Sequence, residues 1–380
     1  MLKQKTEKIL VYGFVGITFL ISILFFVLPH QRFSELENRY LQATPQLTWD
    51  NLLSKKFAEE TESFITDHFP FRPQWLWLKS TAEKARLQQE NNGIYDGKDG
   101  YLFEKFVEPD YTKVLLYTES LNQFAEKHPD TNMTFMLIPT SIGLYSERLP
   151  YLAPSYPQKK VNAFVEESLQ SGIHFLDGFD ILEPHSTEDI YYRTDHHWKT
   201  YGAYLAYVAY AKQMGWQPLS QQAFTIETVS NSFLGSYHTR SQFTGVTPDT
   251  IEVYIPHHTV STEMYIADVD QTTTSLYDEH FLEKKDQYSY FLGGVHSLMT
   301  LTTKLDAQQM DLDKLLVIKD SYAHNMLPFL TNHVAEIHVI DLRYYNGDIT
   351  DYMEKNGIQD VLFLYNTATF VEDGSLTKLK

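Results

Sequence analysis

Apolar residues form one long block near the start of the chain, running from Ile9 to Leu28 without a charged residue. Its length matches the ~20 residues that a helix needs to cross the hydrocarbon core of a bilayer. Three lysines lie within the eight residues before it, and basic residues are retained on the cytoplasmic side of a membrane. We therefore predict a cytoplasmic tail at residues 1–8, a single-pass transmembrane anchor in the cell membrane at residues 9–28, and an extracytoplasmic location for the rest of the chain.

A cleaved signal peptide is the alternative interpretation of this block. The apolar stretch of a signal peptide is usually shorter, and a cleavage site with small residues follows it. Here Pro29–Phe33 follows instead, and the chain has no cysteine that could carry a lipid anchor. We therefore adopt the interpretation of an uncleaved anchor.

The next segment, residues 29–92, is polar and rich in Glu, Gln and Lys. Apolar residues such as Phe57, Phe64 and Ile65 lie at helical spacing within it. This pattern predicts a helical, membrane-proximal segment. In the following residues 93–103, Gly and Asp separate two short apolar pieces, which is typical of a β-hairpin.

From residue 93 to residue 380, short apolar stretches alternate with segments long enough to form helices. Five of these stretches predict strands: Thr134–Ile138, Ile173–Leu176, Leu315–Ile318, Ile337–Ile340 and Val361–Leu364. Tyr201–Met214 predicts a helix, with Ala and Tyr at close helical spacing. Alternating strands and helices favour an α/β fold with a doubly wound parallel sheet. Residues 217–310 break this rhythm with many Thr, Ser, Tyr and Gly, and we interpret them as a β-rich insertion.

Composition and charge narrow the possible partners. Apolar residues make up 43% of the chain and charged residues 21%, which is ordinary for a globular protein. A net charge of −18 repels a phosphate backbone, so nucleic acid is a poor partner. The absence of cysteine excludes disulfides, thiolate metal sites and cysteine nucleophiles.

A polar residue that could react follows each of the last three predicted strands. The three segments are Lys319–Ser321, Asp341–Arg343 and Tyr365–Asn366. Reactive residues of a doubly wound sheet belong at the carboxyl ends of its strands. Ser321 lies between a strand and a helix, where a nucleophile would have its own N–H near a helix N-terminus. A serine that caps the helix is the alternative interpretation.

The segment Tyr191–Trp198 carries the highest density of chemical groups. Its Asp195, His196 and His197 could be metal ligands, a catalytic base with an orienting carboxylate, or polar surface residues. Other possible zinc ligands are His257, His258 and His296, but no His-x-x-x-His pair on a helix supports a zinc site. We therefore predict neither a metal nor another cofactor.

Two blocks carry a resemblance to a known family. Thr194–Trp198 matches a T-D-x-H-W motif, and Asp320–Tyr322 matches a motif that contains the nucleophile. Further similar segments lie upstream: Glu37-Asn38-Arg39, Phe69–Arg72, Gly97–Phe103 and Pro139-Thr140. From about residue 34 to its end, the chain resembles the DHHW-type proteins and the alginate O-acetyltransferase (AlgJ/AlgX-like) branch of the SGNH hydrolase superfamily.

The resemblance implies an SGNH-hydrolase-like fold with a permuted motif order, in which Asp and His precede Ser. It implies that Ser321 is the nucleophile, His197 the general base and Asp195 the carboxylate that fixes the histidine tautomer. Trp198 follows the histidine, so the Asp-x-x-His spacing of ordinary SGNH enzymes is absent. We expect Trp198 to pack beneath the histidine.

The resemblance also implies a set of groups around the oxyanion. Asn366 matches the position of the superfamily's oxyanion asparagine. Arg343 stands where an ordinary SGNH enzyme has an oxyanion glycine. Its guanidinium could bind the oxyanion or an anionic sugar, or form an ion pair with Asp341 or Asp348. Tyrosines near the site could stack on sugar rings or simply pack: Tyr322, Tyr344 and Tyr345.

Three functions follow as hypotheses. The first is O-acetylation of a cell-surface or exported polysaccharide, with acetyl groups supplied through a multipass membrane O-acyltransferase. The second is a polysaccharide acetyl esterase that uses the same triad. The third is a non-catalytic scaffold or polysaccharide-binding subunit of an export or acetylation complex. It predicts that the side chains of Ser321, His197 and Asp195 do not converge.

Overall fold

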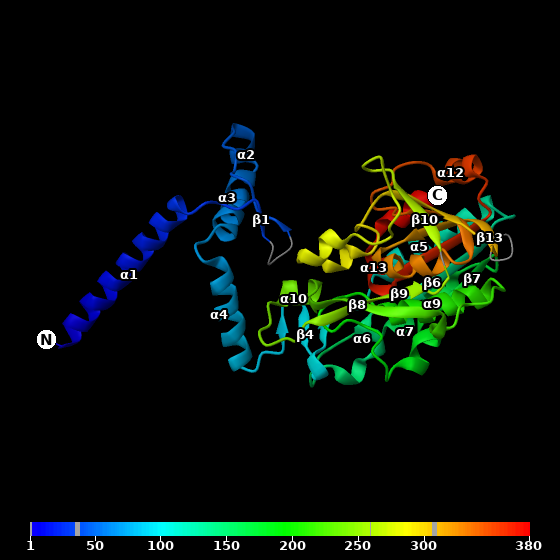
Figure 1. Ribbon diagram of the computed structural model, residues 1–380. Helices are drawn as coiled ribbons and strands as arrows, with labels where there is room; N and C mark the ends of the chain where they lie inside the picture. Colours follow the sequence, from blue (N-terminus) through cyan, green and yellow to red (C-terminus); the bar gives the residue numbers. More distant parts are fainter. Residues whose placement is uncertain (1, 35–38, 259, 306–309) are drawn as a thin grey trace. The chain divides into compact units, whose positions relative to one another are not determined.

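The computed structural model describes residues 2–34, 39–258, 260–305 and 310–380 (Figure 1). Glu37 and Asn38, which belong to one of the upstream segments that carry the resemblance, lie outside the described residues. The described chain separates into two compact units, which meet in sequence at Gln88 and Gln89.

The first unit comprises residues 1–88 together with residues 242–244. It begins with α1 (Leu2–Val27), the helix predicted from the apolar block. Its segment Lys8–Val27 is long and apolar enough to cross a membrane, and none of it is buried. The other elements are β1 (Phe33–Ser34), β2 (Arg39–Tyr40), α2 (Trp49–Leu53), α3 (Lys56–Asp67) and α4 (Arg72–Ala85).

The second unit is built on an eight-stranded sheet with the order β11-β10-β12-β14-β13-β15-β6-β7. Its strands are β6 (Asn132–Ile138), β7 (Ile173–Asp177), β10 (Ser261–Ile266), β11 (Gln271–Thr273), β12 (Leu298–Lys304), β13 (Leu312–Lys319), β14 (Val334–Ile340) and β15 (Asp360–Asn366). The five predicted strands are all present as β6, β7, β13, β14 and β15. These five pair in parallel, which confirms the prediction of an α/β fold with a parallel sheet.

Strands in the middle of the sheet are apolar along their length because both of their faces are covered. Leu315–Ile318 of β13 and Val361–Leu364 of β15 are buried throughout. The covering helices include α5 (Tyr111–Lys127), α7 (Gln158–Ser168), α8 (Gly178–Leu182), α9 (Thr200–Gln213), α12 (Ile349–Asn356) and α13 (Thr367–Glu372). The carboxyl ends of β13 and β15 therefore project from a rigid, buried core.

The insertion at residues 217–310 contributes to two sheets. Its β12, β10 and β11 extend the main sheet in antiparallel fashion beyond β14. Burial alternates along β10 and β12, as expected for antiparallel strands with one covered face. Its β8 (Phe224–Phe233) and β9 (Asp249–Pro256) form a separate antiparallel pair with two register shifts. The insertion is therefore β-rich, as predicted, and its strands β10, β11 and β12 belong to the main sheet.

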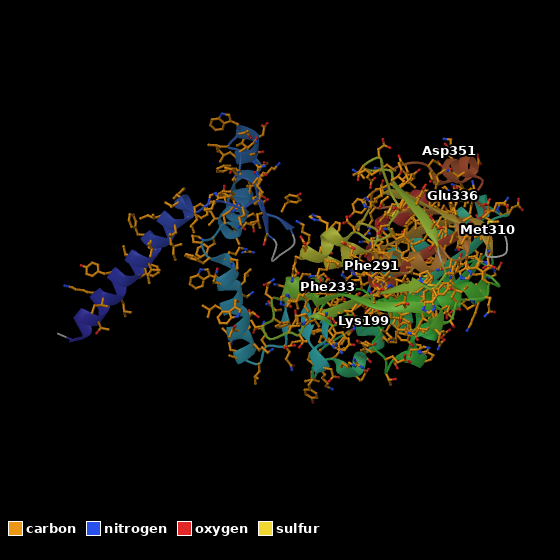
Figure 2. The ribbon with its side chains drawn as sticks, in the orientation of Figure 1. Lys199, Phe233, Phe291, Met310, Glu336 and Asp351 are labelled. Atoms are coloured by element: carbon orange, nitrogen blue, oxygen red, sulfur yellow. The ribbon has the colours of Figure 1, made fainter. Side chains whose placement is uncertain are left out.

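A small apolar cluster lies beneath the β8–β9 pair. Phe233 and Phe291, labelled in Figure 2, belong to it together with Tyr192, Ile251, Val253, Tyr288 and Tyr290. Tyr288 and Tyr290 come from the short 3-10 helix η6 (Gln287–Tyr290). The predicted hairpin at residues 93–103 is also present, as β4 (Ile94–Asp96) and β5 (Leu102–Glu104).

Candidate active site

The nucleophile candidate lies directly after β13. Ser321 is the first residue of the 3-10 helix η7 (Ser321–Asn325), and its side chain is partly exposed. The cap of this helix is Asp320, whose Oδ1 accepts the Tyr322 N–H at 2.8 Å. The alternative interpretation of Ser321 as the capping residue is therefore wrong. Its hydroxyl is free to face the histidine.

Asp195, His197 and Ser321 converge in the structure. The His197 Nε2 lies 2.7 Å from the Ser321 Oγ. The His197 Nδ1 lies 2.6 Å from the Asp195 Oδ1. The two ring nitrogens thus face a hydroxyl on one side and a carboxylate on the other, which is the arrangement of a base-activated serine.

The Asp195 carboxylate is held by its surroundings as well as by the imidazole. Its Oδ1 also accepts the His197 N–H at 3.0 Å, and its Oδ2 accepts the Ser236 N–H at 2.7 Å. Burial alone would raise the pKa of Asp195, but His196, His197 and these hydrogen bonds outweigh burial and hold the pKa well below its usual range. Asp195 is therefore an anion throughout the neutral range.

Gly235 provides the space that this carboxylate occupies. A Cβ at Gly235 would lie 2.3 Å from both the Cβ and the Oδ2 of Asp195. Because that distance is far inside van der Waals contact, a side chain at position 235 is incompatible with the observed carboxylate. Gly235 follows β8, so the insertion shapes the acidic end of the triad.

Asp249 fixes the residue before the triad carboxylate. This buried aspartate opens β9, and its two oxygens accept the N–H groups of Arg193 and Thr194 at 2.9 and 2.8 Å. Its Oδ2 also accepts the Thr194 hydroxyl at 2.7 Å. Burial raises the pKa of Asp249, and these donors act in the opposite direction. The Thr194 conformation, and with it the direction of Asp195, depends on this residue of the insertion.

His196 takes a different role from its neighbour. Its Nδ1 lies 2.7 Å from the Ser236 Oγ, and its ring centroid lies 3.7 Å from that of His197. Burial and the adjacent His197 lower the pKa of His196 to about 4. His196 is therefore neutral at pH 7 and supports the base from one side.

Trp198 packs on Tyr322, with ring centroids 5.2 Å apart, and the Tyr322 ring lies 5.6 Å from that of His197. Trp198 is buried, and its indole N–H donates to the Tyr322 carbonyl at 2.9 Å and to the Asn325 Oδ1 at 2.7 Å. Tyr322 is fully buried, and its hydroxyl donates to the His196 carbonyl. The expected packing role of Trp198 agrees with this arrangement. Of the two roles left open for Tyr322, its burial agrees with packing and not with substrate contact, because the ring has no exposed face on which a sugar could stack.

Asn366 lies next to Asp320 at the end of β15. Its backbone N–H and its Nδ2 each donate to the Asp320 Oδ2 at 2.7 Å. The second Nδ2 hydrogen is donated to the Thr369 Oγ1, also at 2.7 Å. Both amide hydrogens are thus directed away from an oxyanion at Ser321. In this geometry Asn366 holds the turn that carries the nucleophile.

Arg343 forms the ion pair that the sequence left open as one of its roles. Its Nε and Nη2 donate to the two oxygens of the buried Asp341 at 2.9 and 2.6 Å. Asp341 also accepts the Lys319 Nζ at 3.2 Å. Burial would raise the pKa of Asp341, but the two cations outweigh it and lower the pKa. The Arg343 guanidinium also lies over the ring of the exposed Tyr344, 5.5 Å from its centroid.

Three residues of the site could in principle hold a metal ion. Asp195, His196 and His197 offer ligand atoms that lie within 4.8 Å of one another. Both nitrogens of His197 already face Asp195 or Ser321, and the His196 Nδ1 faces Ser236. Coordination through all three residues would break part of this network, so the donor set fits acid–base chemistry better than metal binding.

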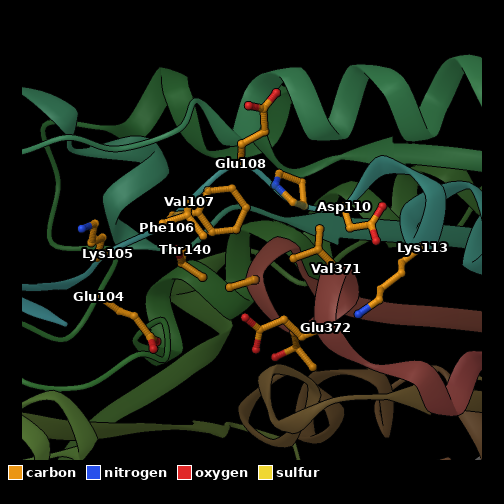
Figure 3. Close-up of a pocket in the computed structure, with 13 residues that line it drawn as sticks. Glu104, Lys105, Phe106, Val107, Glu108, Asp110, Lys113, Thr140, Val371 and Glu372 are labelled. Carbon is orange, nitrogen blue, oxygen red and sulfur yellow. The ribbon is translucent and has the colours of Figure 1, made fainter. Parts of the chain in front are cut away.

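A cavity of about 500 Å³ lies beside the strand ends (Figure 3). Thr140 after β6 and Thr369 in α13 are part of its wall. Thr369 links it to the triad through Asn366 and Asp320. Charged residues also line it: Glu104, Lys105, Glu108, Asp110, Lys113 and Glu372. Most of these charged residues are acidic, and apolar residues such as Phe106 and Val371 form much of the remaining wall.

The structure brings together three residues that the sequence singled out, Asp195, His197 and Ser321. The residues of the insertion that contact them or their chain neighbours were not predicted. The missed residues are Gly235, Ser236 and Asp249, and also Tyr288, whose ring stacks on that of His197. A local signal existed only for Gly235-Ser236, a turn-forming pair directly after a strand pattern. The contacts of the others join positions far apart in the chain, which a single sequence does not reveal.

The chain is similar to solved structures over most of its length. A DHHW family protein from Eubacterium siraeum DSM 15702 is 27% identical with a TM-score of 0.67, covering 76% of this chain and 95% of that chain. Bacillus cereus PatB1 is 19% identical with a TM-score of 0.64, covering 74% of this chain and 98% of that chain. No curated protein matches the chain. These likenesses confirm the SGNH-hydrolase-like α/β fold predicted from the sequence.

The residues described above also match a family model. The model, described as DHHW protein, covers residues 96–340 and so includes Asp195, His197 and Ser321. It spans more than half of the chain, including both the triad and the insertion that supports it. The chain therefore belongs to the DHHW family.

Proposed function

We propose that this protein transfers an acyl group, most simply acetyl, to a polysaccharide outside the cytoplasm, with Ser321 as the nucleophile. The observation that carries the proposal is the hydrogen-bonded line from Asp195 through His197 to Ser321, with separations of 2.6 and 2.7 Å. A non-catalytic scaffold gives no reason for this convergence, because neither hydrogen bond is needed to hold the sheet together.

The reaction would take place in two steps. In the first, His197 Nε2 accepts the Ser321 proton while Oγ attacks the acyl carbonyl carbon. The protonated His197 then returns this proton to the leaving group of the donor, which leaves an acyl ester on Ser321. In the second step a sugar hydroxyl loses its proton to His197 and attacks the ester. Collapse of this second intermediate restores the Ser321 hydroxyl with the proton from His197.

The surrounding groups would assist in different ways. Asp195 stabilises the imidazolium that forms twice in each cycle. The backbone N–H of Ser321 is a candidate donor to the oxyanion. Asn366 acts through Asp320 as a positioning residue. Arg343 keeps the ion pair with Asp341, which fixes the strand end beside the nucleophile.

The acceptor polymer would lie along the cavity beside the strand ends, which Thr369 connects to Asn366 and Asp320. Carboxylates such as Glu108 and Glu372 accept hydrogen bonds from sugar hydroxyls. The α1 helix would anchor the chain in the membrane with its N-terminus in the cytoplasm. A multipass membrane O-acyltransferase is the partner that would deliver the acyl group from the cytoplasmic side.

Replacement of Ser321 by alanine tests the proposal. We expect the full-length protein in detergent to form an acetyl ester after treatment with p-nitrophenyl acetate, and Ser321→Ala to form none. Intact-protein and peptide mass spectrometry would locate the ester. Ser146→Ala is the matched control because Ser146 is exposed in a short 3-10 turn, and it should retain full labelling.

A second measurement distinguishes transfer from hydrolysis. In the native host, Ser321→Ala should lower the acetyl content of a surface polysaccharide. A rise in acetyl content would instead support the acetyl esterase. An unchanged acetyl content of the polysaccharide, together with acetyl labelling that persists in Ser321→Ala, would contradict both catalytic functions.

A further inference from the structure

We propose that Tyr288, supplied by the insertion, is a positioning residue that holds the base and the nucleophile of the triad in register. This inference rests on the proposed function, because it concerns the acyl-transfer step at Ser321. It assigns part of the catalytic machinery to a region outside the strands that carry the triad.

The Tyr288 ring lies flat against the imidazole of His197. The two centroids are 3.5 Å apart and the ring planes differ by 10°. On the opposite side, the His196 centroid lies 3.7 Å from that of His197. The base is therefore enclosed between two rings, which restrict its rotation out of its own plane. Only in that plane can its two nitrogens face Asp195 and Ser321 together.

The hydroxyl of the same tyrosine contacts the nucleophile. It donates a hydrogen bond to the carbonyl oxygen of Ser321 at 3.1 Å. Tyr288 thus touches the base through its ring and the nucleophile through its hydroxyl. A single side chain with two fixed contacts sets the approach of His197 to Ser321, which is where an error of an ångström is most costly to the rate.

The stacked ring also suits the charge that develops on the base. When His197 takes the Ser321 proton it becomes a cation, and the face of an aromatic ring attracts a cation. His196 on the other side stays neutral at pH 7, since burial and His197 lower its pKa to about 4. The imidazolium therefore meets an attractive face on one side and no repelling charge on the other.

Neighbouring residues of the insertion hold Tyr288 in place. It is 4% exposed, and its ring packs 5.4 Å from that of Phe291. The preceding Gln287 accepts the Ser230 hydroxyl at 2.5 Å and donates to the Ser232 Oγ at 3.2 Å. These contacts attach η6 to β8 and give the ring a defined plane.

The test compares two tyrosines of the same 3-10 helix in the full-length protein, with p-nitrophenyl acetate as the acetyl donor. Tyr288→Leu should lower kcat by about 10-fold to 100-fold while KM changes less than about twofold. The change affects the transfer of the acetyl group to Ser321 and not the binding of the donor. It should slow the modification of Ser321 by phenylmethylsulfonyl fluoride by a similar factor. Tyr288→Phe keeps the stacked ring but loses the hydrogen bond to the Ser321 carbonyl, so it should lower kcat by a smaller factor than Tyr288→Leu.

Tyr290→Leu is the matched control. Tyr290 is also buried and stacks on Tyr277, with centroids 5.2 Å apart, but it does not touch the triad. It should keep kcat within about threefold even where it lowers the unfolding temperature. Should Tyr288→Leu fail to fold, Tyr288→Met replaces it, with the same loss of kcat expected.

Two results would overturn the inference. One is a Tyr288 variant without the ring that keeps kcat and the sulfonylation rate of the parent protein. The other is an equal loss in Tyr290→Leu, which would make the effect a general consequence of disturbing the insertion. Ser321→Ala is assayed beside them. If it is inactive while Tyr288→Leu reacts normally, only the role of Tyr288 fails; if it stays active, the proposed function fails.

Discussion

The end of the parallel sheet and the insertion support the same triad in different ways. The sheet presents Ser321 at the end of a buried strand, and Asp320 and Asn366 tie that end to the neighbouring strand. The insertion supports Asp195 and His197 through single close contacts from irregular segments, such as Gly235.

Because of this difference, we expect the two regions to tolerate mutations to different degrees. At the sheet end, several hydrogen bonds and a covered core share the task of holding the nucleophile, so the loss of one contact leaves the others in place. In the insertion, Gly235, Ser236 and Tyr288 each make a different contact with Asp195 or His197, so one of them does not replace another. We therefore expect changes in the insertion to impair activity more than changes of similar size at the sheet end.

The largest effect is expected for Gly235→Ala. The added Cβ would lie 2.3 Å from Asp195, so the carboxylate must move out of line with His197. A displacement of this order costs about 100-fold in kcat. Steady-state kinetics with p-nitrophenyl acetate would measure the loss. Gly172→Ala is the control, since a Cβ there meets no atom within 4 Å. Parent-like turnover in Gly235→Ala would show that Asp195 does not need its observed position.

An intermediate effect is expected for Arg343→Gln at the sheet end. The change removes two hydrogen bonds to the buried Asp341 but leaves its contact with Lys319. Because the Arg343 side chain is 32% exposed, we expect a loss of about 1–2 kcal/mol in the free energy of unfolding. Urea titration would measure it, and kcat should stay within about threefold. A loss of kcat of about 100-fold with unchanged stability would instead assign the guanidinium to the oxyanion.

The smallest effect concerns pH and His196. Burial and His197 lower the pKa of His196 from 6.5 to about 4 in the folded protein, so the unfolded chain binds more protons between these values. Stability is therefore present above pH 6.5 and is lost as the pH falls toward 4. The side chain is 35% exposed, so solvent screening limits the contribution to less than about 2 kcal/mol.

His196→Gln would isolate this contribution. Urea unfolding at pH 7 and at pH 4.5 should show a smaller loss of stability in the variant than in the parent protein. Other buried histidines keep part of the slope, since burial also lowers the pKa of His324 and of His338. An unchanged difference between the two pH values would contradict the assignment to His196.

The strands of the sheet, and the position of Ser321 directly after one of them, could be predicted from the sequence because both depend on local pattern. A strand buried on two faces is apolar along its length. The apolar run Leu315–Ile318 stops where the polar residues Lys319-Asp320-Ser321 begin, which marks the end of the strand. The role of Ser321 as a nucleophile was implied only by the resemblance. The assignment of His197 over His196 came only from resemblance, since adjacent histidines are equivalent in a linear pattern. In three dimensions the strand-like bridge between Tyr191 and Trp198 turns the two rings to different partners.

The residues of the insertion that contact Asp195 and His197 could not be predicted from local pattern. Ser236 and Asp195 are 41 positions apart, and Thr194 and Asp249 are 55 apart. The pair β8–β9 contains two register shifts, which break the regular alternation that sequence patterns detect. The contacts of Tyr322 and Asn366 differ from those expected for a related reason. Burial of the tyrosine ring and the bonding of the asparagine amide depend on neighbours that follow other strands.

The Asp320 carboxylate has a consequence for the timing of local opening. Its oxygens accept the backbone N–H groups of Tyr322 and Asn366, which belong to segments following two adjacent strands. Neither amide can be released without separating this carboxylate from one of the two chain segments. Both amides should therefore be among the slowest in the protein to exchange with deuterium, at rates close to those of global unfolding. The reactive serine would then stay in place over many catalytic cycles while the donor and the acceptor come and go.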